Sequence, residues 1–156
     1  MTTTIQERAT VDARRLISSE LRATLVAAVR GKSPVLTEEK AERGVGQMLA
    51  FVAASARSDK TLSPSPLVDD FWHAFLLHTK AYQDFCEQTF GRFVHHQPGF
   101  LDKSEHGGKA LRERTVDVIT LAGYELDMEF WPELNLADCT QCHAGCSDSP
   151  NGPKTV

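Results

Sequence analysis

The sequence predicts an all-α protein: a single compact helical domain of about five helices, followed by an irregular cysteine-rich C-terminal tail. Three observations predict this class. Apolar residues recur at steps of three and four along several segments, capping residues and Pro or Gly separate these segments, and no alternating pattern persists long enough to build a sheet. One domain suits a chain of 156 residues, so we expect the helical domain at residues 1–136 and a partly disordered tail at residues 137–156.

The first helix is expected over residues 5–30. Thr4 and Glu7 have the spacing of a capping box, in which each side chain satisfies a backbone N–H of the first turn. Gly31 supplies the left-handed residue that commonly follows the end of a helix. The apolar residues of this segment share one face: Ile17, Leu21, Leu25 and Ala28.

The second helix is expected to begin after Thr37, a capping hydroxyl that precedes two carboxylates. Gly44 and Gly46 each weaken it by up to ~1 kcal/mol relative to alanine, so its stability must come mainly from packing. The segment SDKTLSPSP then ends it. The predicted buried stripe consists of Ala41, Val45, Met48, Leu49, Val52 and Ala56.

The third and fourth helices are expected to form a hairpin. Ser65 before Pro66 is a start signal, because proline at the first helical position has no N–H to leave unpaired. We expect the third helix over residues 66–78, a fourth helix capped by Thr79, and a stop at Gly91. An irregular loop should follow, then a last helix over residues 109–122.

Charge and hydropathy exclude some classes of partner. Seventeen basic and twenty-one acidic side chains give a formal charge of −4, so there is no broad positive field for nucleic acid. Apolar runs fall well short of the ~20 residues that a membrane span needs, so no membrane is expected. The N-terminal sequence has no export signal, which predicts a cytoplasmic protein whose four thiols stay reduced rather than forming disulfides.

The first candidate metal site lies on the third helix. Asp69 and His73 are one turn apart and point the same way, and Asp70 precedes the same imidazole by three residues. His78 lies about 140° around the helix from His73, so one ion does not easily reach both. The alternative is a structural pair, in which a carboxylate near the helix N-terminus bonds the histidine of the next turn.

The second candidate is the pair His95 and His96 in the loop after Gly91. A loop fastened at Gly91 and Pro98 can fold back, so that one of the two imidazoles reaches His73. Neighbouring residues in an extended chain point to opposite sides. The alternative therefore places one ring in the core and the other in solvent.

The third candidate is the tail, with Cys139, Cys142, His143 and Cys146. Thiolates at this spacing suit zinc, copper(I) or an iron–sulfur cluster, with His143, Cys86 or a loop histidine as a fourth ligand. The alternative is a reduced, mobile end without metal. Residues 139–143 also match the attachment pattern for c-type haem, which requires export and is therefore disfavoured. Cys86 itself lies in an apolar stripe and is expected to be inert, and Trp72 and Trp131 to be packing residues.

Residues 66–98 read PLVDDFWHAFLLHTKAYQDFCEQTFGRFVHHQP and resemble bacterial proteins related to the glycine-rich domain-containing proteins of plants. The shared features are Asp69, Trp72, His73, Thr79, Tyr82, Phe85, Cys86, Gly91, His95, His96 and Pro98. Many members have Trp-His-x-His, whereas this chain has Phe75 at the second histidine position. The resemblance implies a helical fold and brings no settled activity with it.

Two functional hypotheses follow. In the first, the chain is a small metal-binding protein, a metal-dependent enzyme or an accessory protein of a bacterial pathway, in which Asp69, His73 and His95 or His96 hold zinc, iron or copper and the tail cysteines hold a second ion. In the second, the chain is a non-enzymatic interaction or scaffold module that engages a protein partner through its acidic surface or its tail, and the histidines only form structural hydrogen bonds. The sequence leaves the oligomeric state, the reaction and the substrate open.

Overall fold

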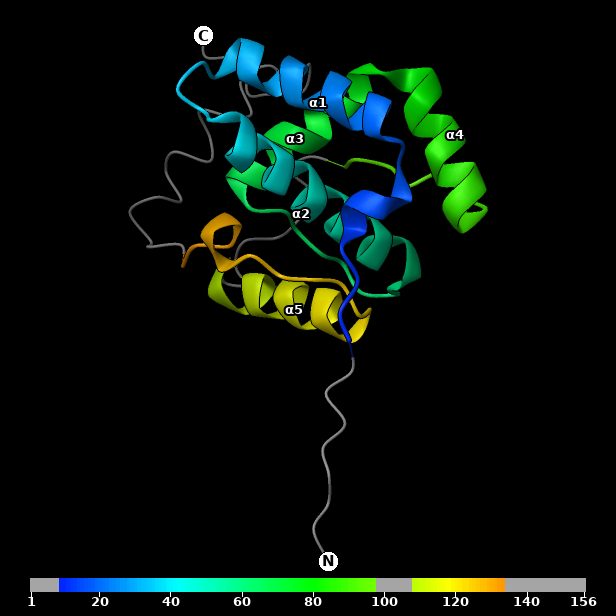
Figure 1. The fold of residues 1–156 in the computed structure, drawn as a ribbon. Coiled ribbons are helices and arrows are strands. Elements are labelled where there is room, and N and C mark those ends of the chain that lie inside the picture. The colour runs from blue at the N-terminus through cyan, green and yellow to red at the C-terminus, as the bar shows by residue number, and fades with distance from the viewer. Residues whose placement is uncertain (1–8, 98–107, 134–156) are drawn as a thin grey trace, which may run out of the picture.

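The computed structural model describes residues 9–97 and 108–133, and within these ranges the only regular elements are helices (Figure 1). The five α-helices confirm the all-α class. The tail at residues 137–156 lies outside the described residues. In chain order the elements are η1 (Ala13–Leu16), α1 (Ser19–Lys32), α2 (Glu38–Arg57), α3 (Pro66–Leu77), α4 (Thr79–Phe90), α5 (Gly108–Leu121) and η2 (Met128–Phe130).

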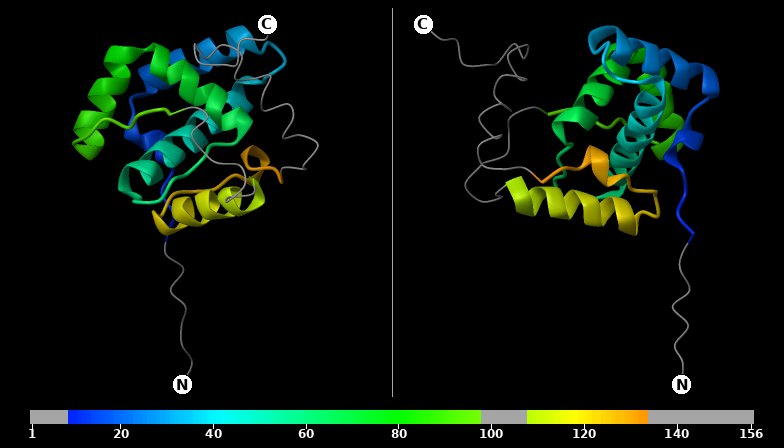
Figure 2. Two further views of the ribbon diagram at one scale, coloured as in Figure 1. Left: turned by 180° about the vertical axis from the view of Figure 1, so that it is seen from behind. Right: turned by 60° about the vertical axis from the view of Figure 1, so that its left-hand side comes forward.

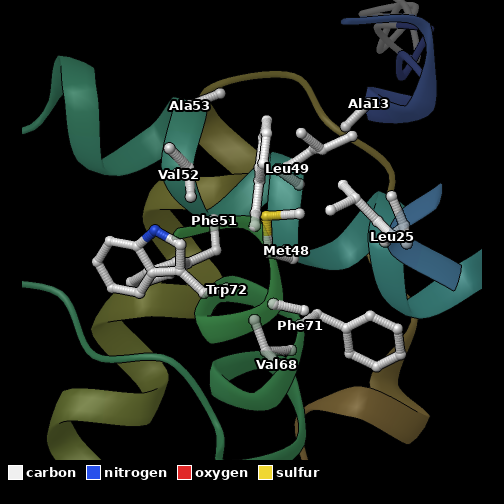
Figure 3. Close-up of a cluster of buried hydrophobic side chains, with 14 of the residues drawn as sticks. Ala13, Leu25, Met48, Leu49, Phe51, Val52, Ala53, Val68, Phe71 and Trp72 are labelled. Atoms are coloured by element: carbon white, nitrogen blue, oxygen red, sulfur yellow. The ribbon is translucent and has the colours of Figure 1, made fainter. Parts of the chain in front are cut away.

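Helix α2 is the centre of the core. It contacts η1, α1, α3 and α5, and α1 and α5 lie on opposite sides of it in every view (Figures 1 and 2). From residue 44 to residue 54 every side of the helix is buried, so the buried surface is wider than the predicted stripe. Figure 3 shows side chains of α2 and α3, among them Phe51, Phe71 and Trp72, in one apolar cluster.

The close contact between α2 and α3 depends on Gly44. A Cβ added at this position would lie 2.3 Å from Cζ of Phe71, so only glycine leaves room for the ring. The packing of Phe71 thus compensates for the weak helix propensity of glycine.

The expected first helix over residues 5–30 is wrong in its bounds. Residues 1–8, with the Thr4–Glu7 capping box, lie outside the described residues, and α1 begins only at Ser19. The oxygen of Ser18 accepts from the N–H of Leu21 at 3.1 Å and starts the helix there. Further upstream, Val11 pairs with Tyr124 in an isolated parallel bridge, the only β-pairing among the described residues.

Other helix ends follow the predicted signals with two corrections. Thr37 and Ser65 cap α2 and α3 through their hydroxyls, and Gly91 ends α4 with φ of 70°. Gly31 was expected to end the first helix, but its φ is not positive and α1 continues to Lys32. Thr79 was expected to cap α4 but is its first residue, because the chain turns directly from α3 into α4.

The segment after α5 folds back onto α2, where Gln47 fixes it. The Gln47 Oε1 atom accepts from Trp131 Nε1 at 2.9 Å and from the N–H of Asp127 at 3.0 Å. Its Nε2 donates to the carbonyl of Glu125 at 3.1 Å. Arg112 of α5 donates to the carbonyl of Trp131. Trp131 is therefore a buried packing residue, as its sequence context predicts.

None of the helices among the described residues has both the length and the apolar character that crossing a lipid bilayer requires.

Candidate metal centre

Three predicted ligands lie close together, two on α3 and one on the segment that follows α4. Asp69, His73 and His96 each present one donor atom, and these atoms all lie within 4.8 Å of one another. His96 Nε2 is 2.9 Å from Asp69 Oδ1, and His73 Nδ1 is 3.4 Å from Asp69 Oδ2. Asp69 therefore faces one imidazole with each of its carboxylate oxygens.

The helix start sets the positions of two of these side chains. The Ser65 hydroxyl accepts from the N–H of Val68 at 3.1 Å, and Pro66 occupies the first turn. Asp69 falls in that first turn, where the helix dipole favours a carboxylate. His73 follows four residues later and lies on the same face.

The third ligand comes from residues 92–97, which have no helical or strand backbone. Burial alternates along them: Val94 is buried and His96 half-buried, whereas Phe93 and His95 are exposed. This period of two is that of an extended chain. It turns His96 toward α3, while the ring of His95 contacts the ring of Phe93 at a tilt, with centroids 4.7 Å apart.

A buried hydrogen-bond chain holds this segment on the helices. Trp72 Nε1 donates to Tyr82 Oη at 3.0 Å, and the Tyr82 hydroxyl donates to the carbonyl of Val94 at 2.7 Å. The Trp72 ring also contacts the His96 ring, with centroids 4.5 Å apart. The sequence predicted Trp72 as a packing residue, and its burial confirms this. Its place beside His73 in the motif of residues 66–98 was the signal of a wider role.

The cluster lies at the surface but is not fully open to solvent. The side chain of His96 is 16% exposed and that of Asp69 is 29% exposed, whereas that of His73 is 49% exposed. The solvent-facing side of the cluster is therefore the side of His73.

Asp70 lies next to the cluster but contributes no donor atom to it. Burial raises the pKa of its carboxyl, and the charge of Asp69 raises it further, whereas His73 and Lys32 act in the opposite direction. The pKa of this carboxyl, which is exposed on one side, is therefore above its ordinary value.

The structure does not bring the remaining predicted ligands into this cluster. His95 belongs to the alternate face of its segment, and His78 lies between α3 and α4 with Nδ1 2.8 Å from the carbonyl of Ala74. Cys86 is a buried free thiol on α4, consistent with an inert packing role. The tail ligands fall outside the described residues: Cys139, Cys142, His143 and Cys146.

Two imidazole nitrogens and a carboxylate oxygen form a donor set that several divalent metals accept. Zinc takes such sets in catalytic sites, and non-haem iron(II) takes two histidines with one carboxylate. A metal ion binds such a set only when the carboxyl is ionised and each imidazole presents a free nitrogen, so its affinity would depend on pH.

A protein-family model described as UCP032817-like matches residues 11–116 of the chain. The matched range includes α1 to α4, most of α5 and all three residues of the cluster. No curated protein and no solved structure matches the chain. The resemblance of residues 66–98 to bacterial relatives of the glycine-rich domain-containing proteins stays a prediction, because the matched model does not bear on it.

Proposed function

The chain belongs to the UCP032817-like family, and we propose that Asp69, His73 and His96, which lie in the matched range, together bind one divalent transition-metal ion. The observation that carries this proposal is the meeting of their donor atoms from two segments separated by α4. Two ligands come from α3, and one comes from the chain beyond α4.

The donor separations support the proposal. Metal–ligand bonds of about 2.0–2.2 Å place neighbouring donors roughly 3–3.5 Å apart around one ion. The contacts of Asp69 with His96 and His73, at 2.9 and 3.4 Å, are close to this spacing but involve different carboxylate oxygens. With one donor atom from each residue the three atoms lie within 4.8 Å of one another, so the side chains would rotate to bring them around a common ion.

The donor set favours zinc, iron or copper, because imidazole suits all three metals and a single carboxylate adds a harder ligand. Three protein ligands leave further positions on such an ion for water or substrate. A metal-dependent hydrolase or oxidase is the enzymatic form of this proposal. Ligands supplied from outside the described residues would close the shell and make the ion structural.

A second candidate function is a non-enzymatic interaction module. The 2.9 Å contact between Asp69 and His96 supports it, because this distance is that of an ordinary hydrogen bond. In this form the cluster fastens residues 92–97 to α3. The partner would then be a protein that binds the acidic surface or the tail.

Metal analysis of the full-length chain, purified without an affinity tag or chelator, separates these two functions. Cultures are supplemented with zinc, iron or copper separately, and the bound metal is counted per chain. We expect one equivalent of one of these metals. Removing a ligand in His73→Ala or Asp69→Asn should weaken binding by more than about 100-fold, since loss of a residue that only orients a ligand already costs 10–100-fold.

The matched control is His95→Ala, which removes a histidine from the same segment but not from the cluster. It should retain the metal. The triple variant Cys139→Ser, Cys142→Ser and Cys146→Ser tests the predicted tail site in the same way. Absence of metal under every supplementation would favour the interaction module, and metal lost only in the triple variant would assign the ion to the tail.

A further inference from the structure

We propose that Tyr82 is a positioning residue for the metal ligand His96, and that its hydroxyl sets the metal affinity of the cluster. This inference rests on the proposed metal site. It concerns a residue on α4 that contributes no donor atom to the cluster.

The segment that carries His96 depends on a small number of anchors. Residues 92–97 have no helical or strand hydrogen bonding, so side chains must fix their backbone. The buried anchor is the hydrogen bond from Tyr82 to the carbonyl of Val94. Arg92 adds a contact with the carbonyl of Ser55 at 3.3 Å, but this contact is exposed.

The Tyr82 hydroxyl completes a hydrogen-bond relay from Trp72 Nε1 to the carbonyl of Val94, because a hydroxyl can both accept and donate. An indole N–H donates and cannot accept, and a carbonyl accepts and cannot donate. The phenol therefore accepts from Trp72 and donates to Val94, which fixes the direction of both hydrogen bonds. All three residues are buried, so water does not substitute readily for a lost partner.

A fixed Val94 carbonyl also fixes the direction of His96. Residues two apart in an extended chain point to the same side. The Val94 side chain is buried in the core, so the His96 ring, on the same side, is turned toward Asp69 and lies against the indole of Trp72. The relay thus joins α4 to the one ligand that α3 does not supply.

Tyr82→Phe tests this role, because it removes both hydrogen bonds and keeps the ring that packs against Phe75 and Phe93. The probe is Co²⁺ alone, titrated into the full-length chain and followed by its visible absorption. We expect the dissociation constant to rise about tenfold or more, with a changed spectrum. Trp72→Phe removes the first hydrogen bond together with the indole that contacts His96, so it should also weaken Co²⁺ binding.

Gln47→Leu is the control for a general loss of stability, since it removes a buried network around the other tryptophan, far from the cluster in the sequence. It should bind Co²⁺ with the wild-type constant and spectrum. A second measurement needs no metal: the ring resonances of His96, identified by their absence in His96→Ala, are recorded by NMR. In Tyr82→Phe they should move toward those of Asp69→Asn.

Unchanged Co²⁺ affinity and unchanged His96 resonances in Tyr82→Phe would overturn the positioning role and leave the metal site standing. A wild-type chain that binds no Co²⁺ overturns the link to metal affinity together with the proposed function. In that case the His96 resonances alone support or overturn the positioning of the ring.

Discussion

Two irregular segments of the chain are held by buried hydrogen bonds that involve a tryptophan indole, but only one of them contributes a residue to the candidate site. Residues 92–97 are fixed by the indole N–H of Trp72 through Tyr82, and residues 125–131 are fixed by the indole N–H of Trp131 on Gln47. Both indoles contact Phe51 of α2, with centroids at 5.1 Å for Trp72 and 6.3 Å for Trp131. The two attachments therefore share one part of the core.

The difference lies in what each attachment holds. The Gln47 network satisfies backbone groups of Glu125 and Asp127 and buries Trp131, so it closes the core. The Tyr82 relay instead leads to a partly exposed cluster of a carboxylate and two imidazoles. Buried hydrogen bonds hold both segments. Those of Gln47 stabilise the core, whereas those of Tyr82 also hold a residue of the candidate site at the surface.

The largest expected effect on stability comes from a substitution in the core, at the contact between α2 and α3. Gly44→Ala places a methyl group inside the contact distance of the Phe71 ring, which must move away from α2. We expect the free energy of unfolding to fall by about 3 kcal/mol, as overpacking in a closed core does. Urea unfolding followed by circular dichroism measures it.

Gly31→Ala is the matched control, because the same substitution is made inside a helix where no atom lies within 4 Å. It should stabilise the protein by roughly 0.5–1 kcal/mol through helix propensity. Equal effects at the two positions would show that α2 and α3 are not in the close contact described.

Gln47→Leu separates the two attachments. It leaves the indole N–H of Trp131 and the N–H of Asp127 without their acceptor, so unfolding should require about 2–3 kcal/mol less free energy. A metal ion at 100 times its dissociation constant should still add about 2.7 kcal/mol to both wild type and variant. Thermal melts with and without Zn²⁺ measure both quantities, and a lost increment in the variant would mean that the attachments are coupled.

The smallest expected effect is a dependence of stability on pH, which the attachment through Tyr82 should show and the attachment through Gln47 should not. Burial raises the pKa of Tyr82 well above its ordinary value of 10.0, so the folded protein keeps this phenol neutral where the unfolded chain ionises it. The stability that this adds is complete below about pH 10 and decreases as the pH rises further. By pH 11 wild type should lose about 1.4 kcal/mol more than Tyr82→Phe.

Urea unfolding at pH 9 and pH 11 measures this difference. In Gln47→Leu the loss relative to wild type should be the same at both pH values, because an amide does not titrate there. Parallel losses in wild type and Tyr82→Phe would contradict the buried, neutral state of the phenol.

Local signals were sufficient to predict most helices and two of the three residues of the candidate site. The Ser65–Pro66 start and the Gly91 stop act within one turn, so α3 and α4 follow from the sequence. The pairing of Asp69 with His73 is a spacing of four on one helix and was predictable for the same reason.

Long-range contacts account for what the sequence did not predict. The start of the first helix was wrong because Ser18, a local cap, begins it later than expected, and because Val11 pairs with Tyr124, which no local pattern reveals. The choice between His95 and His96 depended on which face of an extended segment meets α3. The burial of Gln47 required knowledge that the chain after α5 returns to α2.

The bridge between Val11 and Tyr124 has a consequence for how the protein is made. The N–H of Val11 donates to the carbonyl of Gly123 at 2.8 Å, and the N–H of Glu125 donates to the carbonyl of Val11 at 3.0 Å. These partners are translated near opposite ends of the described chain. The segment around Val11 is synthesised before the segment around Tyr124, so this bridge can form only after the helices between the two have been made.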